Sequence, residues 1–360
     1  MVYYRKYRPQ TISELDLTSV REKLSAILSS EDLPHAFLFT GSKGLGKTSA
    51  ARILAKAINC EKRFQVSGFR SQGESKEKKI KTNLKPSPYN LDPNLEPCNI
   101  CEVCVSITNG SNLDVLEIDA ASNGGVEEIR TLRERVKFAS ATLKKKVYII
   151  DEVHMLSVGA FNALLKTLEE PPSHVVFVLA TTELHKLPAT VISRTFQIKF
   201  EKPSEQEVIN SLDRIVKGED LEVEDGVLHD IYLMADGSFR DGAKILEELF
   251  LASKNQEITK ELAERVFKTG SISEEVFNLL YAFSSRNTKS ALEIIAKLTG
   301  NGTDFKAVIE RMVDHLRGLL MLRNNITSEE KDVLGLNPSN IRELLELSNE
   351  AYGELRLSVL

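Results

Sequence analysis

The chain has 360 residues, of which 42% are hydrophobic and 28% are charged, and its formal net charge is −5. This length suggests roughly two or three globular domains, and the acidic balance argues against a protein that coats nucleic acid with its whole surface. The sequence has no run of about 18 apolar residues and no apolar signal segment at its start, so we expect a cytoplasmic protein without a membrane span.

Short apolar runs alternate with helical patterns between residues 36 and 200. The runs predict buried strands at 36–40, 114–118, 147–151, 175–182 and 196–200. Segments with helical spacing of apolar residues lie between them, at 47–59, 126–139 and 159–170. This alternation predicts an α/β fold with a parallel sheet wrapped by helices.

Helical patterns dominate the chain after Pro203. They cover 204–216, 224–235, 239–253, 259–267 and about 272–360. We therefore expect three domains: an α/β domain at 1–202, a small all-helical domain at 203–270 and a second all-helical domain at 271–360.

A phosphate-binding loop is predicted at residues 41–48. The segment "GSKGLGKT" satisfies G-x4-G-K-[ST] and lies between a predicted strand and a predicted helix. Its glycines let successive backbone amides point at phosphate oxygens at the positive end of the helix. Lys47 can bridge the β- and γ-phosphates, and the Thr48 hydroxyl can ligate Mg²⁺. The predicted contacts to a nucleoside triphosphate are Gly41, Ser42, Lys43, Gly44, Leu45, Gly46, Lys47, Thr48 and Ser49.

Acidic and hydroxyl side chains follow the two next buried strands of this pattern. In "VYIIDEVHML", Asp151 and Glu152 end a strand, where Asp151 can hold the Mg²⁺ shell and Glu152 can polarise an attacking water. Thr181 and Thr182 end the strand after it, where a hydroxyl can sense the γ-phosphate or orient the water. These residues predict hydrolysis of the bound triphosphate.

The four cysteines predict a metal site. Cys98, Cys101 and Cys104 are spaced C-x2-C-x2-C, and Cys60 lies at the end of the helix that follows the phosphate loop. Thiols stay reduced in the cytoplasm, and four thiolates suit a closed, structural Zn²⁺ site. We expect removal of the metal to loosen residues 60–110 and to leave the nucleotide site largely intact.

Two alternatives remain for this region. The cysteines could be reduced thiols without a metal, or the cluster could bind nucleic acid, although no aromatic platform or basic recognition helix accompanies it. Residues 61–97, between Cys60 and Cys98, are rich in Lys, Ser, Asn and Pro. They are either a mobile surface insertion or a basic loop that contacts DNA phosphate.

Several motifs together resemble one family. The phosphate loop, "DEVHMLS", "FNALLKTLEEPP", "LATTELHKLPATVISR" and "GSFRDG" make residues 1–270 similar to the gamma/tau subunits of bacterial DNA polymerase III, the ATPases of the sliding-clamp loader in the AAA+ class. The resemblance implies an AAA+ domain with an inserted zinc module at 60–110, a helical lid at 203–270 and a helical oligomerisation collar at 271–360. It implies the cofactors ATP, Mg²⁺ and Zn²⁺.

The resemblance also implies partners and an activity. ATP hydrolysis would open a beta-type sliding clamp and load it onto primed DNA during replication, in an assembly with delta-type and delta-prime-type subunits and further copies of this chain. As part of the replicative holoenzyme, such a subunit is grouped with DNA-directed DNA polymerases, which are nucleotidyltransferases. No polymerase active site is visible in the sequence.

Further residue roles follow from the same resemblance. Arg194, in "VISRT", matches the arginine finger that reaches the ATP of a neighbouring subunit, and Arg240, in "GSFRD", matches the sensor-2 arginine that reaches the γ-phosphate in its own chain. Tyr7, Arg8 and Pro9 match a segment that packs near the adenine. Three departures are present. Thr195 replaces the cysteine of the family's Ser-Arg-Cys motif, the Gly-Gln that usually follows the N-terminal segment is missing, and the insertion at 61–97 is far longer than the family's usual spacing.

Three rival functions make different predictions. A catalytically silent scaffold subunit would lack ATPase activity. A zinc-dependent nucleic-acid binder with an incidental phosphate loop would bind DNA through residues 1–110 alone. A Holliday-junction or initiator-type AAA+ motor would not bind a sliding clamp.

Overall fold

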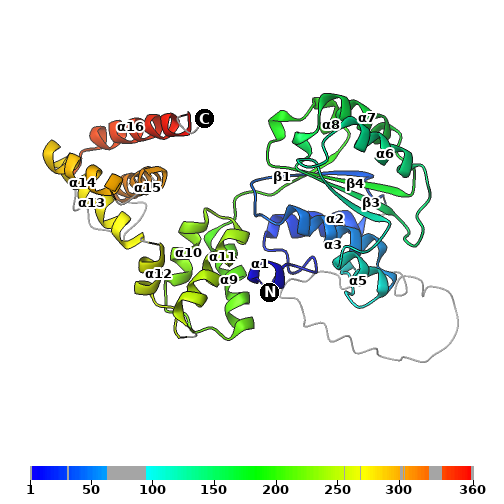
Figure 1. The fold of residues 1–360 in the computed structure, drawn as a ribbon, viewed down its shortest axis with the longest axis horizontal. Coiled ribbons are helices and arrows are strands. Elements are labelled where there is room, and N and C mark those ends of the chain that lie inside the picture. Colours follow the sequence, from blue (N-terminus) through cyan, green and yellow to red (C-terminus); the bar gives the residue numbers. More distant parts are fainter. Residues whose placement is uncertain are drawn as a thin grey trace. The chain divides into compact units, whose positions relative to one another are not determined.

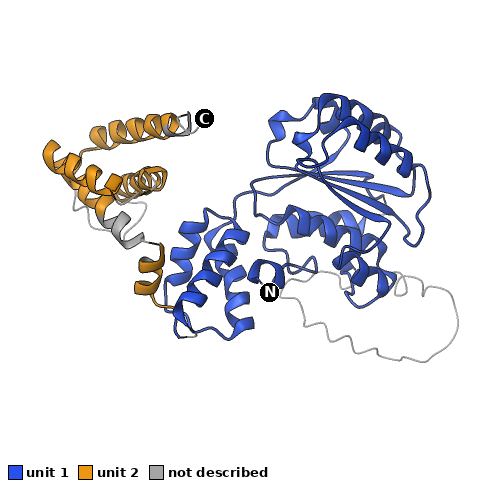
Figure 2. Ribbon diagram, in the orientation of Figure 1, with its two compact units in different colours: residues 1–257 blue, residues 258–360 orange. Residues whose placement is uncertain are grey.

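The computed structural model describes residues 2–30, 32–62, 95–254, 256–267, 269–300, 303, 305–323 and 335–357. Most of the segment between Cys60 and Cys98 lies outside the described residues, and so do both predictions made for it. The chain divides into two compact units, residues 1–257 and 258–360 (Figure 2). No helix in the described ranges is both long enough and apolar enough to cross a membrane.

A five-stranded parallel sheet forms the centre of the first unit (Figure 1). Its strands are β1 (Ala36–Thr40), β2 (Val115–Asp119), β3 (Lys146–Asp151), β4 (Val175–Thr181) and β5 (Phe196–Lys199). They pair in the order β2-β3-β4-β1-β5, and all neighbours are parallel. The predicted α/β sheet is confirmed, with each strand end within one residue of its predicted position.

Helices cover both faces of this sheet (Figure 1). One face carries α2 (Thr18–Ser29), α3 (Lys47–Asn59) and α5 (Glu102–Thr108), and the other carries α6 (Val126–Val136), α7 (Val158–Glu169) and α8 (Ala189–Ile192). Phe37 and Phe39 of β1 pack into the first layer, and Leu38 packs into the second. Because both faces are covered, the strands appear in the sequence as continuous apolar runs.

Helix α3 is the most enclosed of these helices. All of its residues are buried except Thr48 and Arg52, which are half-buried. Alanines at four positions let it pack closely against the sheet with little loss of side-chain entropy. The helix that follows the phosphate loop is therefore held rigidly along its whole length.

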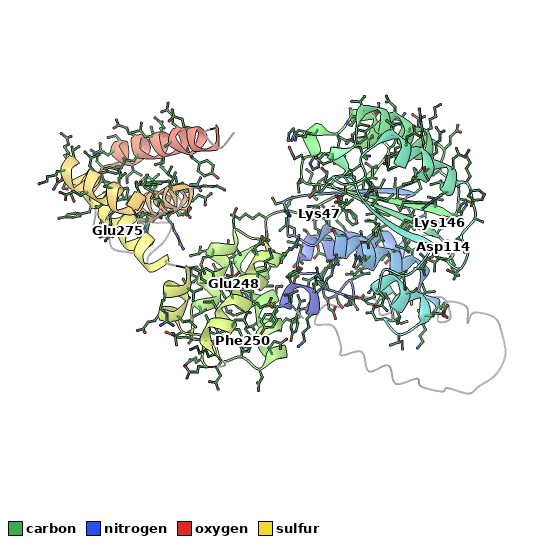
Figure 3. All side chains as sticks on the ribbon, in the orientation of Figure 1. Lys47, Asp114, Lys146, Glu248, Phe250 and Glu275 are labelled. Atoms are coloured by element: carbon green, nitrogen blue, oxygen red, sulfur yellow. The ribbon has the colours of Figure 1, made fainter. Side chains whose placement is uncertain are left out.

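The buried Asp114 lies just before β2 and fixes the loop that leads into β3. Its carboxylate accepts hydrogen bonds from the amides of Ala141 (3.0 Å), Thr142 (2.7 Å) and Leu143 (3.0 Å), which hold this loop, and its backbone carbonyl accepts from the amide of Val147 in β3 (2.8 Å). The position of Asp114 is labelled in Figure 3. Burial alone would raise the pKa of Asp114, but these amides outweigh it and keep the pKa below its usual value.

The remaining elements are short 3-10 turns and helices. The turns are Val153–Met155 and Leu184–Lys186, and the first unit also contains α1 (Tyr3–Lys6), α9 (Glu205–Glu219), α10 (Val227–Ala235) and α11 (Phe239–Ser253). The second unit contains α12 (Lys260–Phe267), α13 (Thr269–Ser284), α14 (Thr288–Gly300), α15 (Phe305–Arg323) and α16 (Pro338–Leu357). The helix predicted from residue 224 begins at Val227, because Gly226 precedes it in a left-handed conformation (φ 93°).

The compact units do not coincide with the three predicted domains. Helices α9–α11 of the predicted lid belong to the first unit, and α12 belongs to the second. The second unit has its own core, in which Val276, Leu280, Leu316 and Ile341 are buried. The predicted boundaries at 202 and 270 stay predictions.

We expect Phe177→Ala to destabilise the first unit strongly. Phe177 is fully buried in β4, and its ring stacks on Tyr148 with centroids 5.5 Å apart. Loss of a buried phenyl ring costs about 3–5 kcal/mol of unfolding free energy. Urea unfolding measures this. The control Phe138→Ala removes a ring that is 69% exposed and should change the unfolding free energy by less than about 0.5 kcal/mol. Equal effects of the two changes would contradict the packing described here.

Candidate nucleotide site and cysteine cluster

The phosphate loop joins β1 to α3 and depends on two glycines. Gly44 and Gly46 adopt left-handed conformations, with φ of 84° and 87°, which side chains other than glycine rarely tolerate. A Cβ atom on Gly44 would also lie 2.0 Å from the Oγ of Ser238, the N-cap of α11. The loop can therefore take this shape, and approach α11 this closely, only with glycine at position 44.

Lys47 opens α3 and is directed into the loop. Its Nζ donates hydrogen bonds to the carbonyls of Gly41 (2.7 Å) and Ser42 (2.9 Å), at the position labelled in Figure 3. Burial lowers the pKa of Lys47, while the nearby carboxylates of Glu152 and Asp151 act in the opposite direction. A partly desolvated ammonium at the start of a helix is suited to binding a phosphate group.

The two predicted magnesium ligands are in direct contact. Thr48 Oγ1 donates to Asp151 Oδ2 over 2.7 Å. Thr48 follows β1 and Asp151 ends β3, and β4 separates these two strands in the sheet. Parallel pairing brings the carboxyl ends of all three strands to one edge. A hydroxyl and a carboxylate at this spacing provide the oxygen ligands that Mg²⁺ prefers.

Glu152 is held in a strained conformation beside this pair. Its φ of 47° and ψ of 45° are unusual for a residue with a side chain. Its Oε2 accepts a hydrogen bond from Thr182 Oγ1 (3.2 Å) and lies 3.5 Å from His154 Nδ1. The backbone and two neighbours thus fix the direction of the carboxylate.

The two threonines play different structural parts. Thr182 contacts Glu152, whereas Thr181 is fully buried and its Oγ1 lies 3.0 Å from His154 Nδ1 and accepts from the amide of Glu183 (3.0 Å). Neither threonine lines the cavity described next. Their predicted catalytic roles stay predictions, and the observed contacts suggest that they position Glu152 and His154.

A cavity of about 740 Å³ opens beside the phosphate loop. Most of the residues predicted for nucleotide binding or hydrolysis line it: Tyr7, Arg8, Pro9, Lys43, Gly44, Leu45, Gly46, Lys47, Thr48, Ser49, Asp151, Glu152 and Arg240. The structure thus brings together residues from the N-terminus, the phosphate loop, the end of β3 and the start of α11. Gly41, Ser42 and Arg194 are predicted site residues that do not line it.

The N-terminal residues form one wall of the cavity. Arg8 Nε donates to Ser49 Oγ in α3 over 2.7 Å, and burial lowers the pKa of the Arg8 guanidinium. The guanidinium of Arg240 lies 4.9 Å from the ring centroid of Tyr4. Sequence reasoning missed Tyr4, and the only signal for it was the tyrosine-rich start of the chain.

Sequence reasoning also missed most of the apolar lining. It consists of Leu15, Leu17, Val20, Ile53, Phe200, Ile215, Phe239 and Ala243. These residues come from separate segments of the chain and share no local motif. Their common position follows only from packing α2, α3, α9 and α11 together.

Arg194 lies away from the cavity, just after α8. Its guanidinium forms an ion pair with Glu169 (2.8 Å) and donates to the carbonyl of Thr190 (2.9 Å). About a third of its side chain is exposed. Arg194 therefore does not contact the nucleotide cavity of its own chain.

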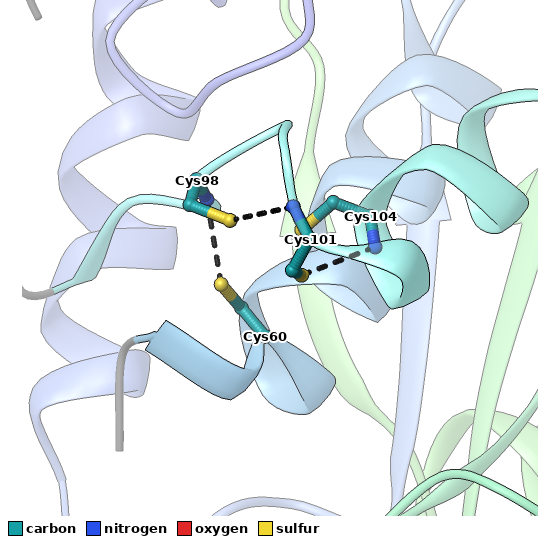
Figure 4. A group of neighbouring side chains, drawn as sticks. All are labelled: Cys60, Cys98, Cys101 and Cys104. Atoms are coloured by element: carbon teal, nitrogen blue, oxygen red, sulfur yellow. Dashed lines mark hydrogen bonds between the residues drawn. The ribbon is translucent and has the colours of Figure 1, made fainter. Parts of the chain in front are cut away.

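The four cysteines converge at the other end of α3 (Figure 4). Their Sγ atoms all lie within 4.8 Å of one another. Amides of the following turn donate to two of the sulfurs: Cys101 N to Cys98 Sγ (3.3 Å) and Cys104 N to Cys101 Sγ (3.5 Å). Cys98 N donates to Cys60 Sγ (3.4 Å).

The donor set fits a zinc ion. Zinc with Zn–S distances of about 2.3 Å would hold its four sulfurs about 3.8 Å apart, so the cysteines need only a small contraction. The hydrogen bond with Cys60, together with burial, raises the pKa of Cys104 well above its usual value, because a second thiolate is unfavourable in so small a space. A divalent cation would remove this penalty.

Sheet order, phosphate loop and paired acids define a P-loop α/β protein, and comparison with known proteins refines this class. The fold is similar to that of a variant of RuvB from Thermotoga maritima, with a TM-score of 0.50 over 94% of this chain and 98% of that chain. The two sequences are 15% identical, so this similarity concerns the fold alone. A family model described as DNA polymerase III, delta subunit, matches residues 17–87 and 68–204.

Curated relatives identify the family. The gamma subunit of DNA polymerase III from Buchnera aphidicola is 32% identical over 97% of this chain and 87% of its own length. The tau subunit from Bacillus subtilis is 41% identical over 89% of this chain and 52% of its own length, and that from Escherichia coli is 34% identical over 89% and 45%. The chain belongs to the family of gamma and tau subunits of DNA polymerase III. It spans about half the length of the first relatives it matches.

We expect the purified chain to carry one zinc ion held by Cys60, Cys98, Cys101 and Cys104. Elemental analysis of protein prepared without chelator measures this. Replacing the buried Cys104 by serine should lower the zinc content to well below one per chain, since a hydroxyl is a poor substitute for thiolate. The control Ser106→Ala, in the same helix, should keep the metal. Wild-type protein without zinc would contradict this prediction.

Proposed function

We propose that this chain is an AAA+ ATPase subunit of a sliding-clamp loader, which binds and hydrolyses ATP to open a clamp and load it onto primed DNA. The observation that carries the proposal is the contact between Thr48 and Asp151, with Glu152 beside them, at the mouth of a phosphate loop. Membership of the gamma/tau family supplies the biological setting.

In the proposed site each residue has a distinct electrostatic task. The amides at the start of α3 and the ammonium of Lys47 would bind the β- and γ-phosphates. Thr48 and Asp151 would hold Mg²⁺, which supplies charge neutralisation on the phosphates when bound. Glu152, fixed by its strained backbone and by Thr182, would orient and polarise the attacking water.

The N-terminal wall and α11 would complete the nucleotide site. Tyr7, Arg8 and Pro9 would lie on the adenine side, next to the apolar lining. Arg240, at the start of α11 and beside Tyr4, would approach the γ-phosphate from the helical lid. The same chain would then sense its nucleotide through the position of α11.

The wider assembly is also part of the proposal. Residues 271–360 would form a collar that joins this chain to further copies and to delta-type and delta-prime-type subunits, and a beta-type clamp and primed DNA would be the substrates. The module of four cysteines would be a structural zinc site. The subunit would belong to the polymerase holoenzyme without performing nucleotidyl transfer.

The rival functions have weaker support. A silent scaffold would not need Lys47, Thr48, Asp151 and Glu152 arranged around one cavity. A Holliday-junction motor shares the fold, but the curated relatives with the higher sequence identities are polymerase III subunits. ATPase activity with and without clamp and primed DNA tests the proposal, and no stimulation by either would argue against it.

Lys47→Ala and Glu152→Gln should separate binding from hydrolysis. We expect Lys47→Ala to weaken binding of an ATP analogue by roughly tenfold or more, because the phosphates lose their main cationic partner. Glu152→Gln should bind ATP normally and lose at least about a hundredfold in turnover. Fluorescence titration and phosphate release measure the two effects, and circular dichroism checks the fold. Normal hydrolysis by Lys47→Ala would show that the assignment of the phosphate loop is wrong.

Arg194→Ala should impair a neighbouring site rather than its own. Because Arg194 lies outside the cavity, we expect nucleotide binding by the isolated chain to be unchanged. Hydrolysis in the assembled complex should fall by roughly 10³–10⁵-fold, the usual contribution of an arginine finger. The control Arg130→Ala, an exposed arginine of α6, should change neither quantity. Weakened binding by the lone Arg194→Ala chain would contradict a role in trans.

A further inference from the structure

Residues 7–17, here called the N-terminal arm, connect α1 to α2 without regular structure. The arm lines the nucleotide cavity through Tyr7, Arg8, Pro9 and Gln10 and again through Leu15, Asp16 and Leu17. A segment without helix or strand hydrogen bonds must be held by its neighbours if it is to form a defined wall. Arg8 is held by Ser49 of α3, as described above, and the hydroxyl of Tyr7 donates to Glu219 of α9 (2.8 Å). Three further contacts within the first unit hold the rest of the arm.

One anchor of the arm comes from Cys60 and residues 95–108, here called the cysteine module. The carboxylate of Glu96 accepts hydrogen bonds from the arm amides of Ile12 (2.7 Å) and Ser13 (2.8 Å). Glu96 lies two residues before Cys98, in the turn that leads into the cluster. Two charge-assisted hydrogen bonds to successive amides fix both the position and the direction of the arm.

Lys56 supplies a second anchor between the N-terminal arm and the cysteine module. It is 1% exposed in α3, and its Nζ donates to the carbonyl oxygen (2.9 Å) and the side-chain oxygen (2.8 Å) of Gln10. The same Nζ donates to Asn99 Oδ1 (2.8 Å), inside the Cys98–Cys101 turn, and lies 3.3 Å from Thr108 Oγ1. One buried ammonium therefore joins the arm, α3 and the cysteine module.

The arm also reaches the helical part of the first unit. Arg214 of α9 donates to the carbonyl of Glu14 (2.9 Å) and to the carboxylate of Asp16 (2.6 Å). Helix α9 contributes Ser211 and Ile215 to the cavity. A displacement of the arm would therefore affect two walls of the cavity together.

We propose that the cysteine module positions the nucleotide cavity: through Glu96 and Lys56 it holds the N-terminal arm in place, so that nucleotide affinity depends on the metal-bound state of the module. Glu96 does not line the cavity and would act as a positioning residue. This inference rests on the proposed function, because it requires a nucleotide in the cavity. The sequence alone led us to expect that zinc removal leaves the nucleotide site largely intact. Under this inference, zinc removal should instead lower the affinity for nucleotide.

The test uses the full chain with an exposed acid of the same module as control. Glu96→Ala removes both arm contacts, and Glu102→Ala makes the same charge change on the exposed side of α5. We expect both variants to retain one zinc per chain. In Glu96→Ala, amide hydrogen exchange should rise in residues 8–17 and the Kd for a fluorescent ATP analogue should rise about tenfold, while Glu102→Ala should match the wild type. Glu96→Gln, which keeps one acceptor oxygen, should be intermediate.

A thermodynamic cycle compares the wild type and Glu96→Ala, each with and without zinc. The zinc-free protein is prepared by chelation and returned to magnesium buffer. Removing zinc should raise the Kd of the wild type and have less effect on Glu96→Ala, because the connection through Glu96 is already broken there and only the one through Lys56 and Asn99 remains. Lys56→Met, altered on the α3 side, should also increase exchange in the arm. Because Lys56 itself lines the cavity, arm exchange rather than the Kd is the readout for this variant, and it serves as the test if Glu96→Ala fails to retain zinc.

Two outcomes would overturn the inference. One is a zinc-retaining Glu96→Ala protein whose arm exchange and Kd equal those of Glu102→Ala. The other is an equal effect of zinc removal in the wild type and in Glu96→Ala. Lys47→Ala distinguishes these failures from a failure of the proposed function: if that variant binds the analogue normally, the cavity is not the nucleotide site at all.

Discussion

A hydrogen bond of 2.7 Å between Thr48 and Asp151 joins residues 103 positions apart, and the rest of the site is organised around it. It exists because β1, β4 and β3 run parallel and end at one edge of the sheet. A different strand order would leave the phosphate loop and the acids on separate parts of that edge. Burial of apolar side chains on both faces holds the sheet together, and the order of its strands decides which side chains meet at the edge.

Helix α3 extends this constraint into the molecule. It begins with Lys47 and Thr48 at the nucleotide cavity and ends next to Cys60 in the cysteine cluster. Its 13 residues span about 20 Å, and nearly all of them are buried. A helix enclosed in this way cannot shift at one end without repacking the other. The cavity and the cluster are thus the two ends of one rigid element, with Lys56 between them.

Function in this protein cannot be assigned from the fold. A RuvB variant has a similar fold with 15% sequence identity. Proteins with a P-loop α/β fold have many different functions. The family assignment comes from relatives at 32–41% identity. The structure adds what the family name does not contain, namely which side chains meet around the cavity and which, such as Arg194, lie away from it.

The sequence by itself determined the strands, the phosphate loop and the cysteine cluster. Strands buried on both faces are continuous apolar runs, and the loop and the C-x2-C-x2-C turn are local patterns whose backbone geometry follows from adjacent residues. Only the tertiary structure decided that Tyr4 faces Arg240, that Thr182 holds Glu152 and that Glu96 holds the N-terminal arm. Each of these contacts joins segments far apart in the chain, so it depends on strand order and helix packing, which local periodicity does not encode.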